Sequence, residues 1–519
     1  MASIFTNIPS SFGQSAFAFV VILVILGASS LSHILLQRLI YYHKVRRIPY
    51  AHNVGFWKRW LSNETRDSFL RDFGGLSKIG FDKNEHAFRV QTDHSEVIIL
   101  APKYATEIRD GKGLSAGLYT EIELMGSLPG MEAFSFAGTH RELMHDVITR
   151  HFNRALPSML SGIAEEASEC LNSLWGKSSE WKTIPLYESM LSPISQVSIR
   201  VFLGREMSRN KRWVQVNLQY TVVGLGAVSA LRRWPRFLLP IIHHFHPQMR
   251  ATRALTKEAK EILRPIVESR KSKRDGPSNS LDWFQEVAAQ RGDRYNPEVA
   301  QLTFSVAAMH STSDHLTQVL FDLARHQDAV HALRREMVKV IGDEGWTITA
   351  LNNLKLMDSV LKESQRLKPV NQAITVFNKR AVLKDIYLSN GVCLPEGSFV
   401  AVSSSRMRDP AVYPDPDEFK PDRFVKLASS DSETARYSGF SAVSIDHTGF
   451  GFGKHACPGR TYVTLELKII LCHILLLYDI KVPEGFVPNL MIHGFDSLTD
   501  LTASMHIKRR EPEINLPGW

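Results

Sequence analysis

The sequence contains little cysteine: four residues in 519, namely Cys170, Cys393, Cys457 and Cys472. They lie far apart and form no CxxC pair, which argues against both a disulfide framework and a zinc site. Three of them are expected to be small buried hydrophobic residues in a reducing compartment. Cys457 differs from these three because of the residues that surround it.

The chain also lacks any run of five or more Lys or Arg residues, although its formal net charge is +9. A nucleic-acid-binding arm is therefore unsupported, and we expect no nucleic-acid partner. The basic balance points instead to an anionic membrane surface or to an acidic protein partner. A flavin or dinucleotide fingerprint is absent as well, so redox chemistry would need electrons from a separate protein.

Charged residues are missing from the amino terminus: no Lys, Arg, Asp or Glu precedes Arg38, and residues 16–36 are almost wholly apolar. A membrane-spanning helix needs about 20 such residues. Basic residues follow the stretch, which is the reverse of the charge order in a cleaved signal peptide. The positive-inside rule then places the bulk of the chain on the cytoplasmic side of a membrane. A buried core helix is the alternative.

Helical periodicity dominates the chain from about residue 137, and short β-like runs occur between residues 80 and 101. Long helices are predicted from residue 297 to about 330, from 352 to 367, and from Cys457 to about 478. The predicted fold is mainly α with small β-sheets. Its predicted parts are a short lumenal tail (1–15), a transmembrane signal anchor (16–36), a basic linker (37–49) and one large domain (50–519).

Cys457 lies in the segment FGFGKHACPGR, residues 450–460, which has the pattern of a glycine-rich loop leading into a helix. Gly453 and Gly459 allow backbone conformations and a close approach that a Cβ would block. Pro458 suits the first helical position, where its missing N–H would be unpaired anyway. The positive end of the helix dipole is expected to lower the pKa of Cys457 and favour its thiolate. A cysteine thiolate is a ligand of haem iron; a chance loop cysteine is the alternative.

This segment resembles the haem-binding signature of the cytochrome P450 family. Phe450, Gly453, His455, Cys457 and Gly459 fill every fixed position of that signature, with His455 where the family usually has Arg. The resemblance implies a cytochrome P450-like haem-thiolate fold for the large catalytic domain. It also implies haem b as the cofactor, with Cys457 as the axial ligand of the iron. The motifs are most similar to those of fungal microsomal enzymes of secondary metabolism, such as the ent-kaurene oxidase-like group.

A second pattern consists of one acidic and two basic residues. Glu363 and Arg366 are i,i+3 neighbours on a predicted helix, and Arg423 follows in the segment PDRF. Taken alone, such a pair is usually a surface salt bridge that contributes little. The resemblance to the family instead implies a buried structural triad of these three residues behind the haem.

The predicted long helix carries AAMHST, residues 307–312, which resembles the oxygen-binding stretch of the family. The resemblance gives Ser311 the role of passing protons to bound dioxygen, with Thr312 as a second candidate. His310 stands where an acid is usual. Because histidine can also relay protons near neutral pH, His310 is either a catalytic relay or a hydrogen-bonded core residue.

Contacts with the haem propionates and with substrate are less marked in the sequence. The Trp-x-x-x-Arg pair common in the family is absent near residue 145, where His145 and Arg150 either bind a propionate or form a solvated helix face. By resemblance, the candidates for the substrate pocket are Val306, Ile374, Thr375 and Phe495. Each of them could instead belong to the core. Their largely neutral character indicates a hydrophobic small-molecule substrate.

The resemblance therefore predicts a monooxygenase that inserts one oxygen atom from O2 into a hydrophobic substrate, a terpenoid or another fungal secondary metabolite. NADPH would supply electrons through a separate NADPH-cytochrome P450 reductase, with cytochrome b5 as a further partner. The enzyme would be a single-pass protein of the endoplasmic reticulum membrane, in contact with lipid. An O2-independent haem-thiolate isomerase or dehydratase is one alternative, and a non-catalytic haem-binding sensor is another.

Overall fold

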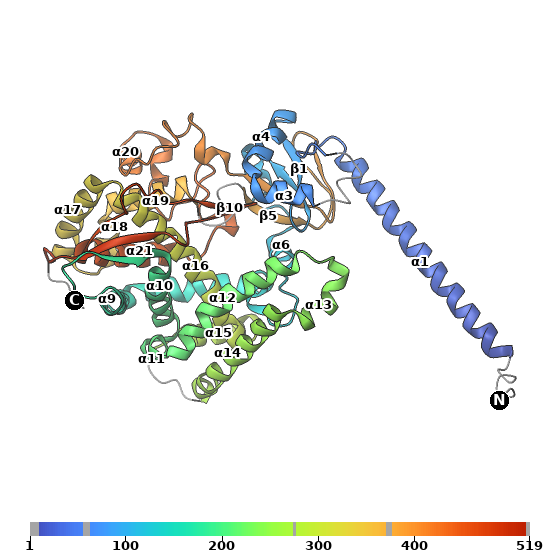
Figure 1. Cartoon of the computed structure of the whole chain (residues 1–519), viewed down its shortest axis with the longest axis horizontal. Coiled ribbons are helices and arrows are strands. Elements are labelled where there is room, and N and C mark those ends of the chain that lie inside the picture. Colours follow the sequence, from blue (N-terminus) through green and yellow to red (C-terminus); the bar gives the residue numbers. More distant parts are fainter. Residues whose placement is uncertain (1–9, 55–62, 273–276, 370–375, 515–519) are drawn as a thin grey trace.

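The computed structural model describes residues 10–54, 63–272, 277–369 and 376–514. Helices make up most of the body, and the strands form separate small sheets, with the sheet that contains β1 and β5 on the side from which α1 extends (Figure 1). The helices are α1 (Ser10–Val45), α3 (Glu64–Arg71), α4 (Phe73–Lys83), α5 (Ala105–Ile108), α6 (Ala116–Glu123), α7 (Glu132–Thr139), α8 (Arg141–Asp146), α9 (Asn153–Trp175), α10 (Leu186–Leu203), α11 (Arg205–Arg209), α12 (Lys211–Leu231), α13 (Leu239–Phe245), α14 (Pro247–Ser272), α15 (Ser280–Arg291), α16 (Pro297–Ala324), α17 (Gln327–Glu344), α18 (Ile348–Asn353), α19 (Lys355–Leu367), α20 (Arg423–Ala428) and α21 (Arg460–Leu477).

The strands form small sheets, as the sequence predicts. They are β1 (Ala87–Gln91), β2 (Glu96–Leu100), β3 (Leu114–Ser115), β4 (Lys182–Pro185), β5 (Val376–Val382), β6 (Ile386–Tyr387), β7 (Cys393–Leu394), β8 (Phe399–Ser403), β9 (Tyr478–Lys481), β10 (Met491–His493), β11 (Asp496–Leu498) and β12 (Ser504–Arg509). The largest sheet has the order β1-β2-β8-β5-β3, in which β2 and β8 are parallel and the other neighbours antiparallel. Because β5 lies inside this sheet, most of its side chains are buried.

The long helix α16 crosses the body and forms its core together with α9, α10 and α21. It begins where the sequence predicts: the Asn296 side chain accepts a hydrogen bond from the Val299 amide, and Pro297 occupies the first turn. Its predicted end near residue 330 is wrong. The helix ends at Ala324, and α17 follows after His326, whose φ of −128° and ψ of 70° are not helical. Apolar residues recur on both sides of this break, so periodicity does not reveal it.

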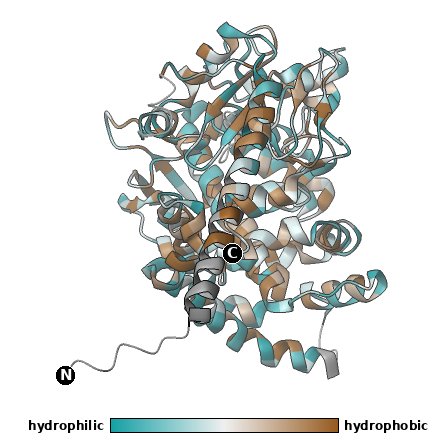
Figure 2. Cartoon of the chain, turned by 90° about the vertical axis from the view of Figure 1, so that its right-hand side faces the viewer, coloured by the Kyte–Doolittle hydropathy of each residue, from teal (hydrophilic) through white to brown (hydrophobic). Residues whose placement is uncertain are grey.

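The first helix, α1, extends away from the body (Figure 1). Figure 2, viewed from the side to which α1 extends, shows apolar residues along this helix. Among its described side chains, Ile25 is 60% exposed and Leu39 is 68% exposed. Of the helices whose side chains the structure describes, α12 is long and apolar enough to cross a membrane, but it packs against α14 and α16 as core helices do. The amino-terminal anchor therefore stays a prediction.

Candidate functional site

Cys457 lies at the end of a tightly folded loop, directly before α21. The Cys457 amide donates to the Phe450 carbonyl at 2.8 Å, and the Gly451 amide donates to the Thr448 carbonyl at 2.7 Å. Gly451 and Gly453 have φ values of 76° and 78°, which lie in the left-handed region. Glycine adopts this region without the strain that a Cβ causes. These bonds and turns bring Cys457 to a fixed position at the start of a long buried helix.

Gly453 is required for a second reason, because the Arg109 side chain lies against it. A Cβ at Gly453 would come within 2.0 Å of the Arg109 Cγ atom. The loop is also held from outside by Arg141, whose Nη2 donates to the Lys454 carbonyl at 2.7 Å. Asp110 accepts a long hydrogen bond of 3.4 Å from the Lys454 amide. The loop is thus fixed by residues that lie more than 300 positions earlier in the sequence.

The expectation of a lowered thiol pKa at Cys457 is wrong for the protein without metal. Burial raises the pKa of the Cys457 thiol, because a thiolate there loses its hydration. The backbone amides of Gly459 and Arg460 and the Arg460 guanidinium act in the opposite direction, but burial outweighs them. An iron cation at the sulfur would supply the missing positive charge, as metal binding does for coordinating thiols in general.

Next to this loop lies a group of basic side chains that are short of acceptors. Arg380 on β5 is 3% exposed, and its Nη2 has no hydrogen-bond partner among the described residues. Burial, followed by the nearby Arg141, lowers the pKa of Arg380 to about 10. Burial and the charges of Arg380 and Arg141 lower the pKa of His455 to about 3, and its Nδ1 likewise has no partner in the described part of the chain. Asp110 is the acidic residue whose charge acts on His455 in the opposite direction, but it already binds Arg109 at 2.7 Å.

These residues fit a haem. Buried cations without a carboxylate are costly unless an anionic ligand joins them. The two propionates of a haem would provide acceptors for Arg380 and the neutral ring of His455, while Cys457 would bind the iron. Arg141, whose side chain is 26% exposed and pairs with Glu142 at 3.0 Å, would add a further positive charge beside them. Sequence reasoning missed Arg141 and Arg380. The available signal was a lone arginine within the otherwise mostly apolar run VFNKRAV of β5.

The residues predicted for the propionates lie in another environment. His145 and Arg150 have half-exposed side chains and approach Asp146 at 3.8 Å and 3.4 Å. Arg291 also binds Asp146, at 3.1 Å. This half-exposed pairing corresponds to the solvated helix face that was the alternative for both residues.

The hydroxyl-bearing turn of α16 faces the Cys457 loop through a chain of aromatic rings. His315 stacks on Phe440 with ring centroids 5.3 Å apart, and Phe440 meets the edge of Phe450 at 5.1 Å. Ser311 is partly exposed, and its hydroxyl donates to the Ala307 carbonyl at 3.2 Å. Thr312 is buried, and its Oγ1 has no partner among the described residues. Both hydroxyls thus lie on α16 within about one helical turn of His315, the residue that connects this helix to the Cys457 loop.

His310 turns toward α10. Its Nδ1 lies 3.0 Å from the hydroxyl of Tyr187, and burial lowers the pKa of the imidazole. The ring is therefore neutral near pH 7. This contact corresponds to the hydrogen-bonded core histidine that was one of the two predictions for this residue.

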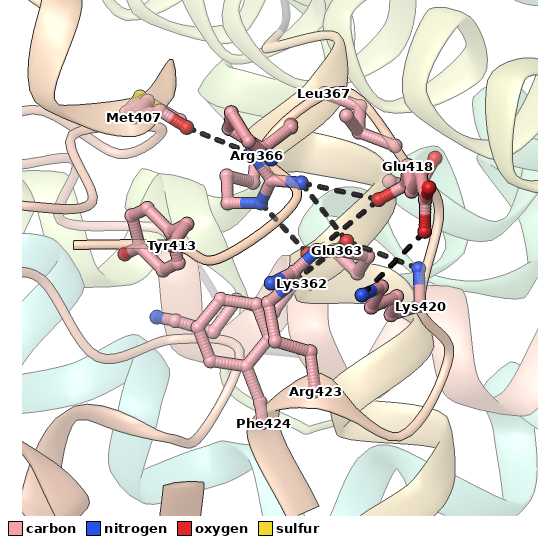
Figure 3. A network of polar contacts seen from close by, with 12 residues as sticks. Lys362, Glu363, Arg366, Leu367, Met407, Tyr413, Glu418, Lys420, Arg423 and Phe424 are labelled. Carbon is pink, nitrogen blue, oxygen red and sulfur yellow. Dashed lines mark hydrogen bonds and ion pairs between the residues drawn. The ribbon is translucent and has the colours of Figure 1, made fainter. Parts of the chain in front are cut away.

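Glu363, Arg366 and Arg423 meet in one buried network (Figure 3). Nε and Nη2 of Arg366 donate to the two Glu363 oxygens at 2.8 Å and 2.9 Å, and Nε of Arg423 donates to Oε1 at 2.9 Å. Arg366 also donates to the carbonyls of Met407 and Pro416. The network joins α19 to the long irregular segment that leads to the Cys457 loop, and it holds both in place.

The residues predicted for the substrate pocket have different surroundings. Val306 is partly buried on α16. Phe495 is 4% exposed and meets Phe69 and Phe73 edge-on, with centroids 4.9 Å and 4.8 Å away. Phe495 thus packs in the core against α3 and α4. Ile374 and Thr375 lie outside the described residues.

Known proteins resemble this chain over most of its length. A family model described as Cytochrome P450 matches residues 120–502. The "Fusicocca-1,10(14)-diene-8beta,16-diol C-9 hydroxylase" of Phomopsis amygdali is 51% identical over 485 residues, covering 92% of this chain and 94% of the relative. The "Dideacetyl fusicoccin A C-19 hydroxylase" of the same fungus is 42% identical over 497 residues, covering 95% and 94%.

Solved structures support the fold. The haem domain of cytochrome P450DA superposes with a TM-score of 0.67 at 18% identity, covering 90% of this chain and 98% of that one. The mainly helical fold with small sheets is thereby confirmed, and the close relatives confirm the resemblance to fungal enzymes of secondary metabolism. The chain belongs to the cytochrome P450 family and is a cytochrome P450 monooxygenase.

Proposed function

We propose that this monooxygenase hydroxylates a terpenoid of the fusicoccadiene kind, or a closely related fungal metabolite. The observation that carries the proposal is the 51% identity, over 92% of the chain, to a relative named as a hydroxylase of a fusicoccadiene diol. A second relative at 42% identity is named as a hydroxylase of a fusicoccin derivative. Two hydroxylases of related scaffolds favour a bulky, largely apolar substrate for this chain too.

The side chains at the site would have two roles: some would bind the cofactor and others would deliver protons. Haem, when bound, supplies the activation of dioxygen. Cys457 provides an anionic sulfur for the iron, and Arg380 and His455 would hold the propionates, with the charge of Arg141 beside them. Ser311 holds its proton in a bond of 3.2 Å to the Ala307 carbonyl, a long bond from which the hydroxyl could be released to deliver a proton at the site. Thr312 offers a second hydroxyl on the same turn.

Electrons would come from NADPH through a separate reductase. Lys454 is exposed beside Cys457, and Arg460 lies at the start of α21 with its Nη1 bonded to the Cys457 carbonyl at 2.7 Å. A basic surface near the thiolate suits an acidic reductase, and cytochrome b5 would use the same surface.

A location in the endoplasmic reticulum membrane is supported by two apolar regions. One is the predicted span at residues 16–36 within α1. The other is α13 and the residues before it, where Phe237, Ile241 and Phe245 are 79%, 58% and 67% exposed. α13 lies on the side of the body from which α1 extends (Figure 1). Aromatic and apolar side chains next to arginines are typical of a surface that contacts lipid headgroups.

The proposal is tested by expressing the full chain with an NADPH-cytochrome P450 reductase in yeast microsomes. Fusicocca-1,10(14)-diene-8β,16-diol and related terpenoids are supplied under isotopically labelled dioxygen. We expect NADPH-dependent products that carry one labelled oxygen, and none from the Cys457→Ser variant. Product without label would support the isomerase or dehydratase alternative. Haem binding without any turnover on these terpenoids would contradict the proposed substrate class.

A further inference from the structure

Asp314, Lys368 and Thr499 meet inside the protein although they come from three distant segments. Asp314 lies on α16, Lys368 directly follows α19, and Thr499 directly follows β11. The Lys368 Nζ binds Oδ2 of Asp314. The Thr499 amide and hydroxyl both donate to Oδ1 of Asp314, at 2.8 Å and 3.0 Å. The three residues are 1%, 1% and 0% exposed. We call this group the Asp314 clamp.

The clamp is a specific arrangement and not a chance contact. Both carboxylate oxygens of Asp314 have partners, and Lys368 lies at the carboxyl end of α19, where the helix dipole favours a cation. A buried ion pair is a poor way to gain stability, because an apolar pair of similar size often does as well. It does, however, fix one geometry, since each partner is costly to leave unpaired. The clamp is therefore suited to holding α16, the end of α19 and the end of β11 in one fixed arrangement.

The position of the clamp connects it with the reaction. Asp314 follows Ser311 and Thr312 by less than one helical turn, and the adjacent His315 leads through Phe440 to Phe450 of the Cys457 loop. Lys368 directly follows α19, the helix that carries Glu363 and Arg366. The chain that reaches Thr499 comes from the β10–β11 hairpin. Asp314 thus connects the turn of α16 that carries Ser311 and Thr312 (the hydroxyl turn) to two segments from other parts of the fold.

We propose that Asp314 is a positioning residue for the monooxygenase reaction. Through Lys368 and Thr499, it sets the distance between the hydroxyl turn of α16 and the two segments that meet it. That distance would in turn set how a large substrate is held next to Cys457 and the hydroxyls of Ser311 and Thr312. The proposal rests on membership of the cytochrome P450 family, not on the terpenoid substrate, so it survives if the proposed substrate class fails.

The test compares two nitrogen ligands of the haem iron in purified full-length holoenzyme. Imidazole is small and would contact only the residues next to the iron. Ketoconazole is long and extends from the iron to the surrounding segments. The variants are Asp314→Asn, Lys368→Met and Thr499→Val, and spectral titration gives the dissociation constant of each ligand. We expect the ratio of the ketoconazole constant to the imidazole constant to rise about tenfold in each variant, because small displacements of positioning groups have large effects.

Asp322 provides a matched control on the same helix. It is a partly buried carboxylate that binds α19 through the Ser364 hydroxyl at 2.6 Å, whereas the clamp reaches the end of β11. Asp322→Asn should change the ratio by less than about twofold. Thr499→Ser keeps the hydroxyl and should restore the ratio.

Two results would overturn the proposal. In the first, the ratio stays constant in all three clamp variants; equal weakening of both ligands is one such case and is the effect of a merely structural role. In the second, Asp322→Asn shifts the ratio as much as the clamp variants do. If Asp314→Asn or Lys368→Met fails to bind haem, Thr499→Val decides, because it removes one hydroxyl and leaves the Thr499 amide and the ion pair in place.

Discussion

Arg380 shows that a single buried side chain can indicate the charge of the ligand that a site binds. Its guanidinium lies on an interior strand, one of its terminal nitrogens has no partner among the described residues, and burial, followed by the charge of Arg141, lowers its pKa. Arg150, by contrast, is half exposed and pairs with Asp146. The difference in burial, not in residue type, makes Arg380 the stronger candidate for binding a haem propionate.

Arg380→Gln should weaken haem binding by about 2 kcal/mol, since a hydrogen bond to a charged group is worth that much. The rate of haem transfer from the purified enzyme to an excess of apomyoglobin measures this loss. Arg150→Gln is the matched control and should change the binding free energy by less than about 0.5 kcal/mol. Equal rates for the two variants would contradict the assignment of Arg380.

At the scale of elements, helices and loops are joined by a few buried polar groups. Glu363 binds Arg366 within α19 and Arg423 at the start of α20, so one carboxylate joins a helix to the segment before the Cys457 loop (Figure 3). The Ser198 hydroxyl joins α10 to α21 by donating to Glu466, which also accepts a hydrogen bond from Tyr462 of its own helix. Glu363 binds two charged arginines, whereas Glu466 accepts hydrogen bonds from neutral hydroxyls. The two carboxylates therefore give different predictions.

Glu363→Gln should lower the free energy of unfolding by about 3–5 kcal/mol, because it leaves two buried guanidiniums without their charge partner. Denaturant unfolding and the haem content of the purified variant measure the effect. Asp417→Asn removes an ion pair with Arg408 whose aspartate is 82% exposed, and it should cost less than about 0.5 kcal/mol. A Glu363→Gln variant as stable as this control would show that the network is dispensable.

Burial raises the pKa of Glu466 from 4.5 to about 8, so the folded protein keeps a proton there that the unfolded chain releases. This residue therefore makes stability fall as the pH rises from 4.5 to about 8, and the loss is complete above the folded pKa. Glu466→Gln should raise the melting temperature at pH 8 more than at pH 5, by about one degree for each kcal/mol in a chain of this length. The exposed Glu484→Gln should leave both values unchanged. A melting temperature of Glu466→Gln that keeps the wild-type pH dependence would contradict this assignment.

At the scale of the whole molecule, the proposed membrane contact has two parts. α1 extends from the body, and the exposed residues Phe237, Ile241 and Phe245 lie in or next to α13. A spanning helix inserts in an effectively irreversible manner, whereas an interfacial surface binds reversibly. The two parts should therefore respond differently to extraction.

Deletion of residues 1–36 should convert the protein from one that resists alkaline carbonate extraction to one that carbonate releases from microsomes. The truncated enzyme should keep its haem and the thiolate band of its reduced carbon monoxide complex. Immunoblots of the membrane and soluble fractions measure the distribution. Carbonate resistance that persists after the deletion would show that another segment inserts in the membrane.

The sequence by itself determined the ligand loop, the Glu363–Arg366–Arg423 group and the helix that carries Ser311 and Thr312. Each depends on short spacings, and local geometry follows from local order. The tertiary structure alone decided which cations surround the site, because Arg380 and Arg141 reach the Cys457 loop from β5 and α8. It also decided that α16 ends at Ala324, that burial raises the pKa of Cys457, and that Asp314 meets Lys368 and Thr499. Burial and long-range proximity arise only when distant segments pack, and no pattern within a segment encodes them.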